Sequence, residues 1–291
     1  MTLVSVLVPA FAAQEFIARP VLSVINQTHA QWELIIASDD GADYQPILSA
    51  HGINDTRIYF TSTSHVQSGP SSARNAALQI ASGDIVAVLD ADDAFAPDKL
   101  EQLLPHVIGH GAATSDIRII ESQSLHEYPS LARRFPARLL TPQEYITANL
   151  HAYSILMWDR RRVNVLWDEQ VPCMEDLIFG LCMYNNLEGI YYEPAPLHLY
   201  YKHPGSITNQ TNTLSHKSDT AQQMIKSCQT LIKRAECNQL QITNKAVSNM
   251  LIHYLKHFIQ LEEKFFQESG DDSVMEFYHF IQKNRDAFYF W

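Results

Sequence analysis

The sequence has few cysteines and few charged residues. Four cysteines occur in 291 residues, none of them spaced as C-x-x-C, and they are too few to hold a chain of this length together by disulfides. Free thiols in the reducing cytosol are the simplest interpretation. Only 18% of the residues are charged against 46% that are hydrophobic, which excludes intrinsic disorder and a charged coiled coil.

Basic charge is also scarce, because Lys and Arg total 21 against 32 Asp and Glu, for a net charge of −11. A general nucleic-acid binder is therefore excluded, since phosphate binding needs a basic surface. No apolar stretch approaches the ~20 residues that cross a bilayer. The apolar segment 3–13 lacks a preceding basic region, so it predicts a buried first strand rather than a signal peptide.

Neither a G-x-G-x-x-G dinucleotide fingerprint nor a G-x-x-x-x-G-K-[ST] phosphate loop occurs. Instead, the first 95 residues alternate short apolar strands with helical patterns. Strands are expected at 4–8, 32–37, 57–61 and 84–89, and helices at 17–25, 44–50 and 71–81, with Gly83 ending the last helix at positive φ. This alternation predicts an open α/β sheet with helices on both faces.

The regular alternation of strand and helix patterns ends after Pro97. The pattern predicts a helix over 99–108, a strand over 112–120, a loop over 121–140 and a helix that begins at Thr141-Pro142. A helix over 174–185 and paired strands at 190–192 and 197–201 follow, and two or three amphipathic helices begin near Leu214.

Acidic residues gather where the first strands end. Residues 1–95 carry ten acidic and three basic side chains, and Asp90 and Asp92 directly follow a buried strand. Ligands of open α/β sheets bind at the carboxyl ends of the strands. Carboxylate oxygens with open positions suit Mg²⁺ or Mn²⁺, which also take up diphosphate oxygens. The alternative is an Asp-rich turn that merely caps the next helix.

Five segments within the first 93 residues together resemble a known family. They are V-S-V-L-V-P-A-F (4–11), S-V-I-N-Q-T (23–28), W-E-L-I-I-A-S-D-D-G (32–41), S-S-A-R-N-A-A (71–77) and G-D-I-V-A-V-L-D-A-D-D (83–93). In this order they closely resemble the donor-binding half of the family 2 glycosyltransferases, which have the GT-A fold. The chain has Ala10-Phe11 where the family usually has Tyr-Asn, and its D-D-G-S-x-D motif is shortened to residues 39–43.

The resemblance implies a donor site. Pro9 and Phe11 would line the uracil pocket, and Asp40 would accept a hydrogen bond from the base N3–H. Asp92 would ligate the divalent cation, and Asp90 would hold the ribose or a metal-bound water, with Ala91 between them in the donor-binding segment. Arg74 would support the nucleotide site, although pairing with a surface acid is an alternative for this residue.

Two later segments also match. W-D-E-Q-V-P-C-M-E-D-L (167–177) resembles the family's F-D-E…E-D pattern, which implies that Asp176 is the general base and that Glu175 orients or tunes it. Plain acidic charge at a helix N-terminus is the alternative. Y-K-H-P-G-S (201–206) resembles a late family segment, in which His203 would be a third metal or diphosphate contact and Lys202 would offset phosphate charge.

The sequence therefore predicts a metal-dependent, inverting glycosyltransferase that uses a nucleotide-diphospho-sugar, most simply a UDP-sugar. The acceptor would be a glycan or lipid-linked molecule of bacterial-type surface polysaccharide synthesis, with the protein in the cytosol or at the inner face of the membrane. A nucleotide-sugar-binding protein without transferase activity and a sugar nucleotidyltransferase are the alternatives.

Three segments are expected in the chain. They are a donor-binding half (1–95), an acceptor-binding half (96–213) and a helical region (214–291). Aromatic residues at 277–280 and 288–291 favour packing onto the catalytic domain or a second subunit, as in a homodimer, over contact with a membrane. Arginines between 133 and 162 would guide an acidic acceptor or form a solvated face.

Overall fold

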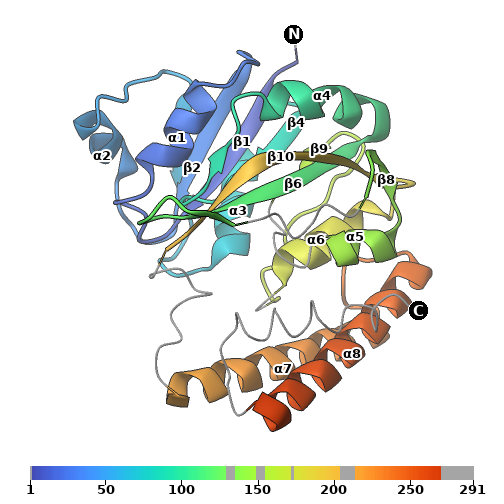
Figure 1. The fold of residues 1–291 in the computed structure, drawn as a ribbon. Helices are drawn as coiled ribbons and strands as arrows, with labels where there is room; N and C mark the ends of the chain where they lie inside the picture. The colour runs from blue at the N-terminus through green and yellow to red at the C-terminus, as the bar shows by residue number, and fades with distance from the viewer. Residues whose placement is uncertain (1, 129–134, 149–154, 172–173, 204–213, 270–291) are drawn as a thin grey trace. The chain divides into compact units, whose positions relative to one another are not determined.

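The computed structural model describes residues 2–128, 135–148, 155–171, 174–203 and 214–269. The chain divides into two compact units (Figure 1). The first comprises Met1–Glu169 and Glu175–Tyr201, and the second comprises Gln170–Met174 and Lys202–Trp291. The predicted subdivision at residues 95 and 213 stays a prediction.

A mixed sheet forms the centre of the first unit. Within the described residues its strand order is β3-β2-β1-β4-β9-β6-β10-β5, with β7 beside β6 and β8 beside β10. The strands are β1 (Val4–Ala10), β2 (Trp32–Ser38), β3 (Ile58–Ser62), β4 (Ile85–Val88), β5 (Ala94–Phe95), β6 (Ala112–Glu121), β7 (Glu127–Tyr128), β8 (Arg138–Leu140), β9 (Met157–Asp159) and β10 (Ile190–Lys202). β1 to β4 pair in parallel, and β9 pairs antiparallel with β4 and β6. The predicted mixed α/β sheet is confirmed.

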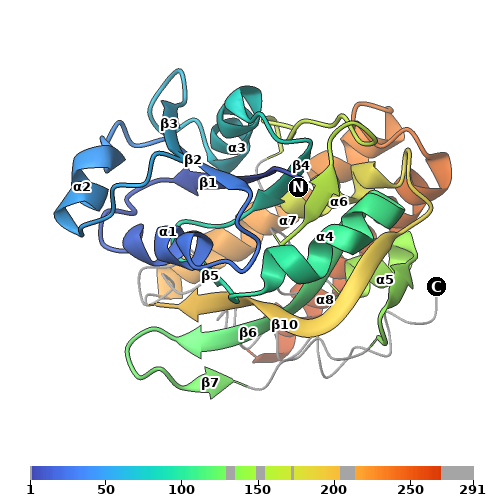
Figure 2. The same cartoon turned by 90° about the horizontal axis from the view of Figure 1, so that it is seen from above.

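Helices cover both faces of the parallel strands, because these strands are apolar at almost every position. The helices of this unit are α1 (Ala18–Ile25), α2 (Tyr44–Ala50), α3 (Pro70–Ile80), α4 (Lys99–His110), α5 (Pro142–Ala148) and α6 (Glu175–Met183). Alternate residues of β1, such as Val6 and Val8, share one core with Val21 of α1 and Leu103 of α4. The opposite face is covered by α3, which lies across the sheet from α1 (Figure 2).

The parallel strands end together at one edge, which places their following turns side by side. In the register, Ala10 of β1 lies opposite Ser38 of β2, and Leu7 lies opposite Val88 of β4. The Asp39 main-chain N–H donates to the Ala10 carbonyl at 2.8 Å, which fixes the exits of β1 and β2 to each other. The chemistry-bearing turns therefore share one edge of the sheet.

Three local expectations are wrong. Residues 190–192 and 197–201 are not two paired strands but parts of the single strand β10, which pairs with β8 near its start and with β5 near its end. The expected loop 121–140 contains the short strands β7 and β8. Gly83 does not adopt positive φ; a Cβ there would lie 2.7 Å from Ser5 Oγ, so the glycine permits a close approach to β1.

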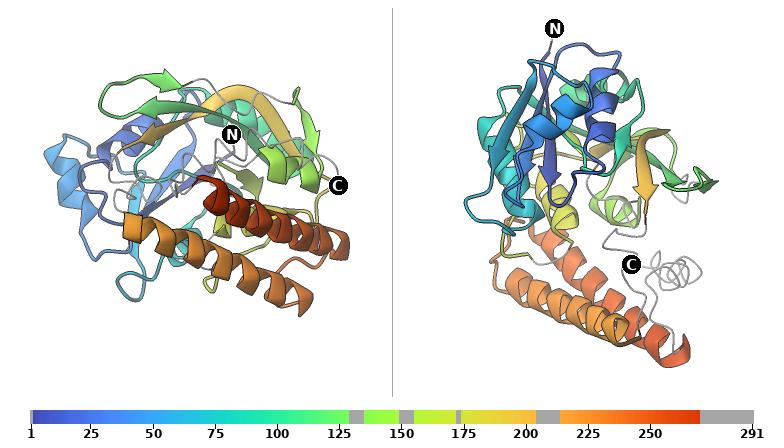
Figure 3. Two further views of the ribbon diagram at one scale, coloured as in Figure 1. Left: turned by 60° about the horizontal axis from the view of Figure 1, so that its bottom comes forward. Right: turned by 90° about the vertical axis from the view of Figure 1, so that its left-hand side faces the viewer.

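The second unit contains α7 (Leu214–Glu236) and α8 (Lys245–Ser269), which lie against each other in both views of Figure 3. Leu231, Leu251 and Leu255 are among their buried apolar residues. Two amphipathic helices were expected here at the least, and the aromatic segments 277–280 and 288–291 lie outside the described residues. No helix in the described ranges combines the length and the apolar character that a membrane span requires.

Candidate active site

The carboxylate of Asp40 ties the exits of β1 and β2 together. It accepts hydrogen bonds of 2.8–3.0 Å from the main-chain N–H groups of Ala12 and Ala42 and from the side chains of Gln14, Ser38 and Tyr44. Burial raises the pKa of Asp40, but the amide and hydroxyl donors outweigh it and hold the pKa below its ordinary value. These five donors already occupy the roughly four lone-pair sites that a carboxylate offers. Asp40 therefore shapes the edge of the sheet at which β1 and β2 end, before any ligand binds.

The neighbouring Asp39 organises the loop that follows β3. Its carboxylate accepts from Thr63 Oγ1 at 2.7 Å and from the main-chain N–H groups of Ser68 and Gly69 at 2.8 and 2.9 Å. Gly69 precedes α3 with φ 94°, a conformation that favours glycine, and Pro70 occupies the first helical turn. The second strand thus fixes where α3 begins and, through it, where Arg74 lies.

Arg74 joins three carboxylates that are distant in the sequence. The residue is 3% exposed. Its Nη2 lies 3.1 Å from Asp90 Oδ1, and its Nη1 lies 3.2 Å from Glu175 Oε1 and 3.0 Å from Asp176 Oδ1. Burial disfavours the charged form, but the surrounding carboxylates outweigh it and raise the pKa of Arg74 above its ordinary value. One buried cation therefore connects the turn after β4 with the start of α6.

Asp176 lies in a partly desolvated position against the Trp167 side chain. The Trp167 indole N–H donates to Asp176 Oδ1 at 3.2 Å, and the Trp167 ring stacks on Phe179 with the centroids 3.8 Å apart. Burial raises the pKa of Asp176 to about 7, against the charge of Arg74, which lowers it, and with the charge of Glu175, which raises it further. A carboxylate with this pKa can accept a proton near neutral pH.

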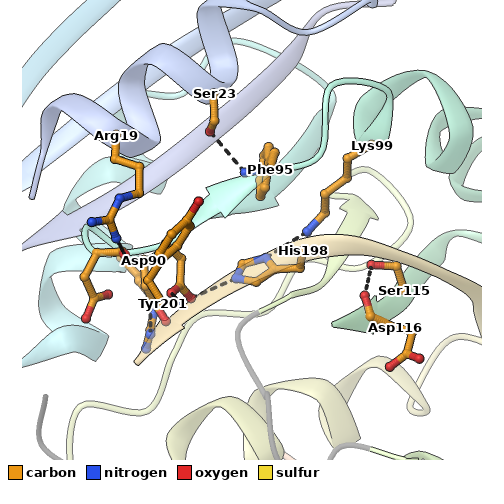
Figure 4. A network of polar contacts seen from close by, with 12 residues as sticks. Arg19, Ser23, Asp90, Phe95, Lys99, Ser115, Asp116, His198 and Tyr201 are labelled. Atoms are coloured by element: carbon orange, nitrogen blue, oxygen red, sulfur yellow. Dashed lines mark hydrogen bonds and ion pairs between the residues drawn. The ribbon is translucent and has the colours of Figure 1, made fainter. Parts of the chain in front are cut away.

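The turn 90–93 is held by contacts with α1 and with the end of β10. Arg19 of α1 donates from Nη1 to the Asp92 carbonyl at 2.8 Å, and its guanidinium lies 3.9 Å from the centre of the Tyr201 ring. Asp93 is 2% exposed and accepts from the Tyr201 main-chain N–H at 2.9 Å, so the turn is fixed to the end of β10, where Figure 4 labels Tyr201. Burial and the charges of Asp92 and Asp90 raise the pKa of Asp93, while the Tyr201 N–H and the charge of Arg19 act in the opposite direction.

Comparison with known proteins shows the family. A model described as "Glycosyl transferase family 2" matches residues 5–162, which is more than half of the chain. The chain belongs to glycosyl transferase family 2.

Individual relatives and solved structures are also similar to it. TuaG of Bacillus subtilis, assigned to teichuronic acid biosynthesis as a glycosyltransferase, is 40% identical over 114 residues, which are 39% of this chain and 45% of TuaG. The Escherichia coli UDP-Glc:alpha-D-GlcNAc-diphosphoundecaprenol beta-1,3-glucosyltransferase WfgD is 37% identical over 99 residues, which are 34% of this chain and 38% of WfgD. The matches span less than half the length of either relative.

The fold extends further than the sequence matches. The crystal structure of S. aureus TarS 1-349 in complex with UDP-GlcNAc superposes with a TM-score of 0.67 at 16% identity, covering 99% of this chain and 84% of that one. This likeness confirms the predicted GT-A fold.

The fold brings most of the residues predicted from the sequence to the same edge of the sheet. Arg74, Asp90, Glu175 and Asp176 share one hydrogen-bonded cluster. Pro9 and Phe11 lie at the end of β1, where Phe11 is 51% exposed. Lys202 and His203 fall in the second compact unit, and their predicted roles stay predictions.

Asp90 and Asp92 carry the kind of oxygen ligands that a divalent cation binds, and their predicted role in metal binding stays a prediction. Among the described residues, no group of three or more His, Cys, Asp or Glu side chains is arranged to hold a metal ion by itself. Asp90 and Asp92 nevertheless offer carboxylate oxygens from a single turn, with Ala91 between them 8% exposed. Mg²⁺ and similar ions are commonly bound through one or two carboxylates together with substrate phosphates and waters.

The predicted arginine cluster is largely engaged within the protein. Arg161 pairs with Asp84 and Asp159, Arg138 pairs with Glu144, and Arg160 donates to the Ala81 carbonyl at 2.7 Å. Arg133 and Arg134 lie outside the described residues. These contacts favour the solvated-face interpretation for the described arginines.

The sequence alone did not single out Trp167 or Arg19, nor did it single out Lys99 and His198, which lie behind the turn 90–93. Trp167 could have been noticed because it directly precedes the D-E pair of the matched segment. Arg19 carried a weaker signal, as one of the three basic residues among the first 95.

Proposed function

We propose that this chain is an inverting glycosyltransferase that moves a sugar from a nucleotide-diphospho-sugar to a hydroxyl of a glycan or lipid-linked acceptor. The observation that carries the proposal is the environment of Asp176. A carboxylate whose pKa burial raises to about 7 shares one arginine with the acidic turn that would hold the donor. Asp176 and the turn 90–93 are thereby fixed relative to each other, which supports the proposal that one accepts the proton and the other binds the donor.

The proposed reaction is a single displacement at the anomeric carbon. Asp176 accepts the proton of the acceptor hydroxyl as its oxygen bonds to that carbon, and the bond between the carbon and the diphosphate oxygen breaks, releasing the nucleoside diphosphate. General-base assistance of this kind contributes typically about 10²- to 10⁴-fold to the rate. The Trp167 N–H and Arg74 hold the Asp176 carboxylate in place.

A UDP-sugar is the donor that the similar proteins support. WfgD is named for UDP-Glc, and TarS was crystallised with UDP-GlcNAc. In this chain, Asp92 and Asp90 would hold Mg²⁺ or Mn²⁺, which when bound neutralises the charge of the diphosphate. The acceptor would belong to bacterial surface polysaccharide synthesis, as the names of TuaG and WfgD indicate for those proteins.

Asp176→Asn tests the proposal because it keeps the size of the side chain and removes its basicity. We expect the rate of transfer to fall by about 10²-fold or more. The rate is measured as the release of UDP in the presence of extracts that contain glycans and lipid-linked glycans as acceptors. Affinity for UDP with Mn²⁺, measured by calorimetry, should change little.

Asp159→Asn is the matched control. Asp159 is also a buried aspartate paired with an arginine, but it lies opposite Ile85, at the other end of β4 from Asp90. Its variant should keep wild-type turnover. Wild-type turnover by Asp176→Asn would remove Asp176 from the reaction, and UDP binding without any transfer by the wild type would favour a non-catalytic binding protein.

A further inference from the structure

Three buried polar side chains form a chain of contacts behind the turn 90–93. Lys99 begins α4, His198 lies in β10 and Asp93 ends the acidic turn, and their exposed fractions are 1%, 1% and 2%. The Lys99 Nζ lies 3.1 Å from His198 Nδ1, and His198 Nε2 lies 2.9 Å from Asp93 Oδ2 (Figure 4). Buried polar groups are costly unless their partners are kept, so this chain constrains three elements at once.

The direction of the hydrogen bonds follows from the partners of the imidazole. Burial, together with the charge of Lys99, lowers the pKa of His198 well below its ordinary value, so the ring is neutral. A neutral imidazole has one donor and one acceptor nitrogen. In its charged form Lys99 offers only N–H donors, and with this form Nδ1 accepts from Lys99 and Nε2–H donates to Asp93.

Asp93 also connects this chain of contacts to the end of β10. Its other oxygen, Oδ1, accepts from the Tyr201 main-chain N–H at 2.9 Å, and Tyr201 stacks under Arg19, which donates to the Asp92 carbonyl. The turn that carries Asp90 and Asp92 is therefore fixed through Asp93 on one side and through Arg19 on the other.

We infer that Lys99, His198 and Asp93 are positioning residues, whose buried hydrogen bonds hold the turn 90–93 in the geometry that a divalent cation and a nucleoside diphosphate require. The inference rests on the proposed function, because it assigns these residues to the donor site. Partners that orient the ligands of a metal affect metal affinity or activity by typically 10- to 100-fold.

Two substitutions of His198 test the donor–acceptor pattern. His198→Leu removes both hydrogen-bonding atoms, whereas His198→Gln keeps one donor and one acceptor on the same terminal group. The probe is UDP or GDP, whichever the wild type binds more tightly, titrated by calorimetry with and without Mn²⁺. We expect His198→Leu to weaken the Mn²⁺-dependent affinity by about 10- to 100-fold, and His198→Gln to recover most of that loss. In rate measurements, the donor KM should rise more than kcat falls.

Lys99→Met provides a second variant in case His198→Leu does not fold, since it removes the first donor of the chain with little change in side-chain volume. Like His198→Leu, it should weaken the Mn²⁺-dependent affinity for the nucleotide. Ser5→Ala is the control for lost stability alone. Ser5 is 0% exposed and joins Glu33 Oε1 at 2.6 Å to the Gly83 N–H at 2.9 Å, beside the start of β4 and away from the turn. Its variant should lower Tm without changing nucleotide affinity.

The outcomes separate this inference from the proposed function. If Lys99→Met or a folded His198→Leu binds the nucleotide as tightly as the wild type and only loses Tm, as Ser5→Ala does, the positioning role is wrong while the transferase proposal stands. If the wild type binds neither UDP nor GDP with Mn²⁺, the proposed function fails and the inference fails with it.

Discussion

Glu175→Gln should make Asp176 a stronger acid. The two carboxylates accept from the same nitrogen, Arg74 Nη1, at 3.2 and 3.0 Å, so the bonded oxygens lie no further apart than the sum of these distances, about 6.2 Å. Across 6.2 Å two unit charges repel by about 2.7 kcal/mol at an effective dielectric constant of 20, and by about 0.7 kcal/mol in bulk water. At 1.36 kcal/mol per pH unit, the substitution should lower the pKa of Asp176 by about 0.5 to 2 pH units.

The sign of the effect on activity follows from the role of Asp176. A general base must be ionised, so kcat/KM of the wild type should rise with pH through the pKa of about 7. In Glu175→Gln this rise should occur at lower pH. At about pH 6 the variant should therefore keep a larger fraction of its own maximal kcat/KM than the wild type keeps of its maximum. The assay is the pH dependence of kcat/KM, which reports the pKa values of the free enzyme.

Trp167→Phe provides the opposite perturbation. It keeps an aromatic ring against Phe179 but removes the N–H that stabilises the charged form of Asp176, so the rise should move to higher pH. If both variants move the profile in the same direction, or Glu175→Gln moves it upward, the ionisation that limits the rate does not belong to Asp176.

Two further predictions concern the metal and the helix that carries the base. Asp92→Ala should abolish the Mn²⁺-dependent part of UDP affinity in calorimetry while the turn keeps its contact with Arg19, because that contact is made by the main-chain carbonyl, which the substitution retains; equal affinity with and without Mn²⁺ in the wild type would contradict this. Gly180→Ala in α6 should lower the free energy of unfolding by about 1–3 kcal/mol, because the new Cβ would overlap the Tyr145 hydroxyl. The new Cβ would also overlap ring carbons of Tyr145, so the matched test is Tyr145→Ala, which removes all of these atoms. In that background Gly180→Ala should cost less in urea unfolding than it does alone, and an undiminished cost would exclude the overlap as its cause.

The parallel half of the fold could be predicted because its signal is local. β1, β2 and β4 are short β-branched runs, and each ends in a turn of recognisable composition, so the sequence places Asp40 and Asp90 at one edge. β10 could not be divided correctly, because Pro194 and Pro196 interrupt its pattern while the strand continues through them. The pairing of β10 with β8 involves residues 190–192 and its pairing with β5 involves His198 and Leu199, so neither proline has to donate a hydrogen bond in these two ladders.

The contacts behind the acidic turn were beyond local reasoning for a different reason. Lys99 and His198 are 99 residues apart, and Asp93 and His198 are 105 apart, so no spacing along the sequence links them. Lys99 also looks like an ordinary polar residue at the start of a helix, whereas the fold buries it against His198. Such a contact becomes visible only when the antiparallel strand β10 returns beside β5.

Arg74 shows how a correctly chosen residue can have a different position from the one expected. The matched A-R-N segment assigns it to the nucleotide site, and the alternative was a surface ion pair. A residue that is 3% exposed and whose guanidinium contacts Asp90, Glu175 and Asp176 fits neither description alone. Removing one partner of a buried ion cluster costs about 3–5 kcal/mol, because the remaining charges stay desolvated. The turn 90–93 and Asp176 therefore depend on one cation for their alignment, and an arginine, whose five donors form a rigid fork, suits this point of α3.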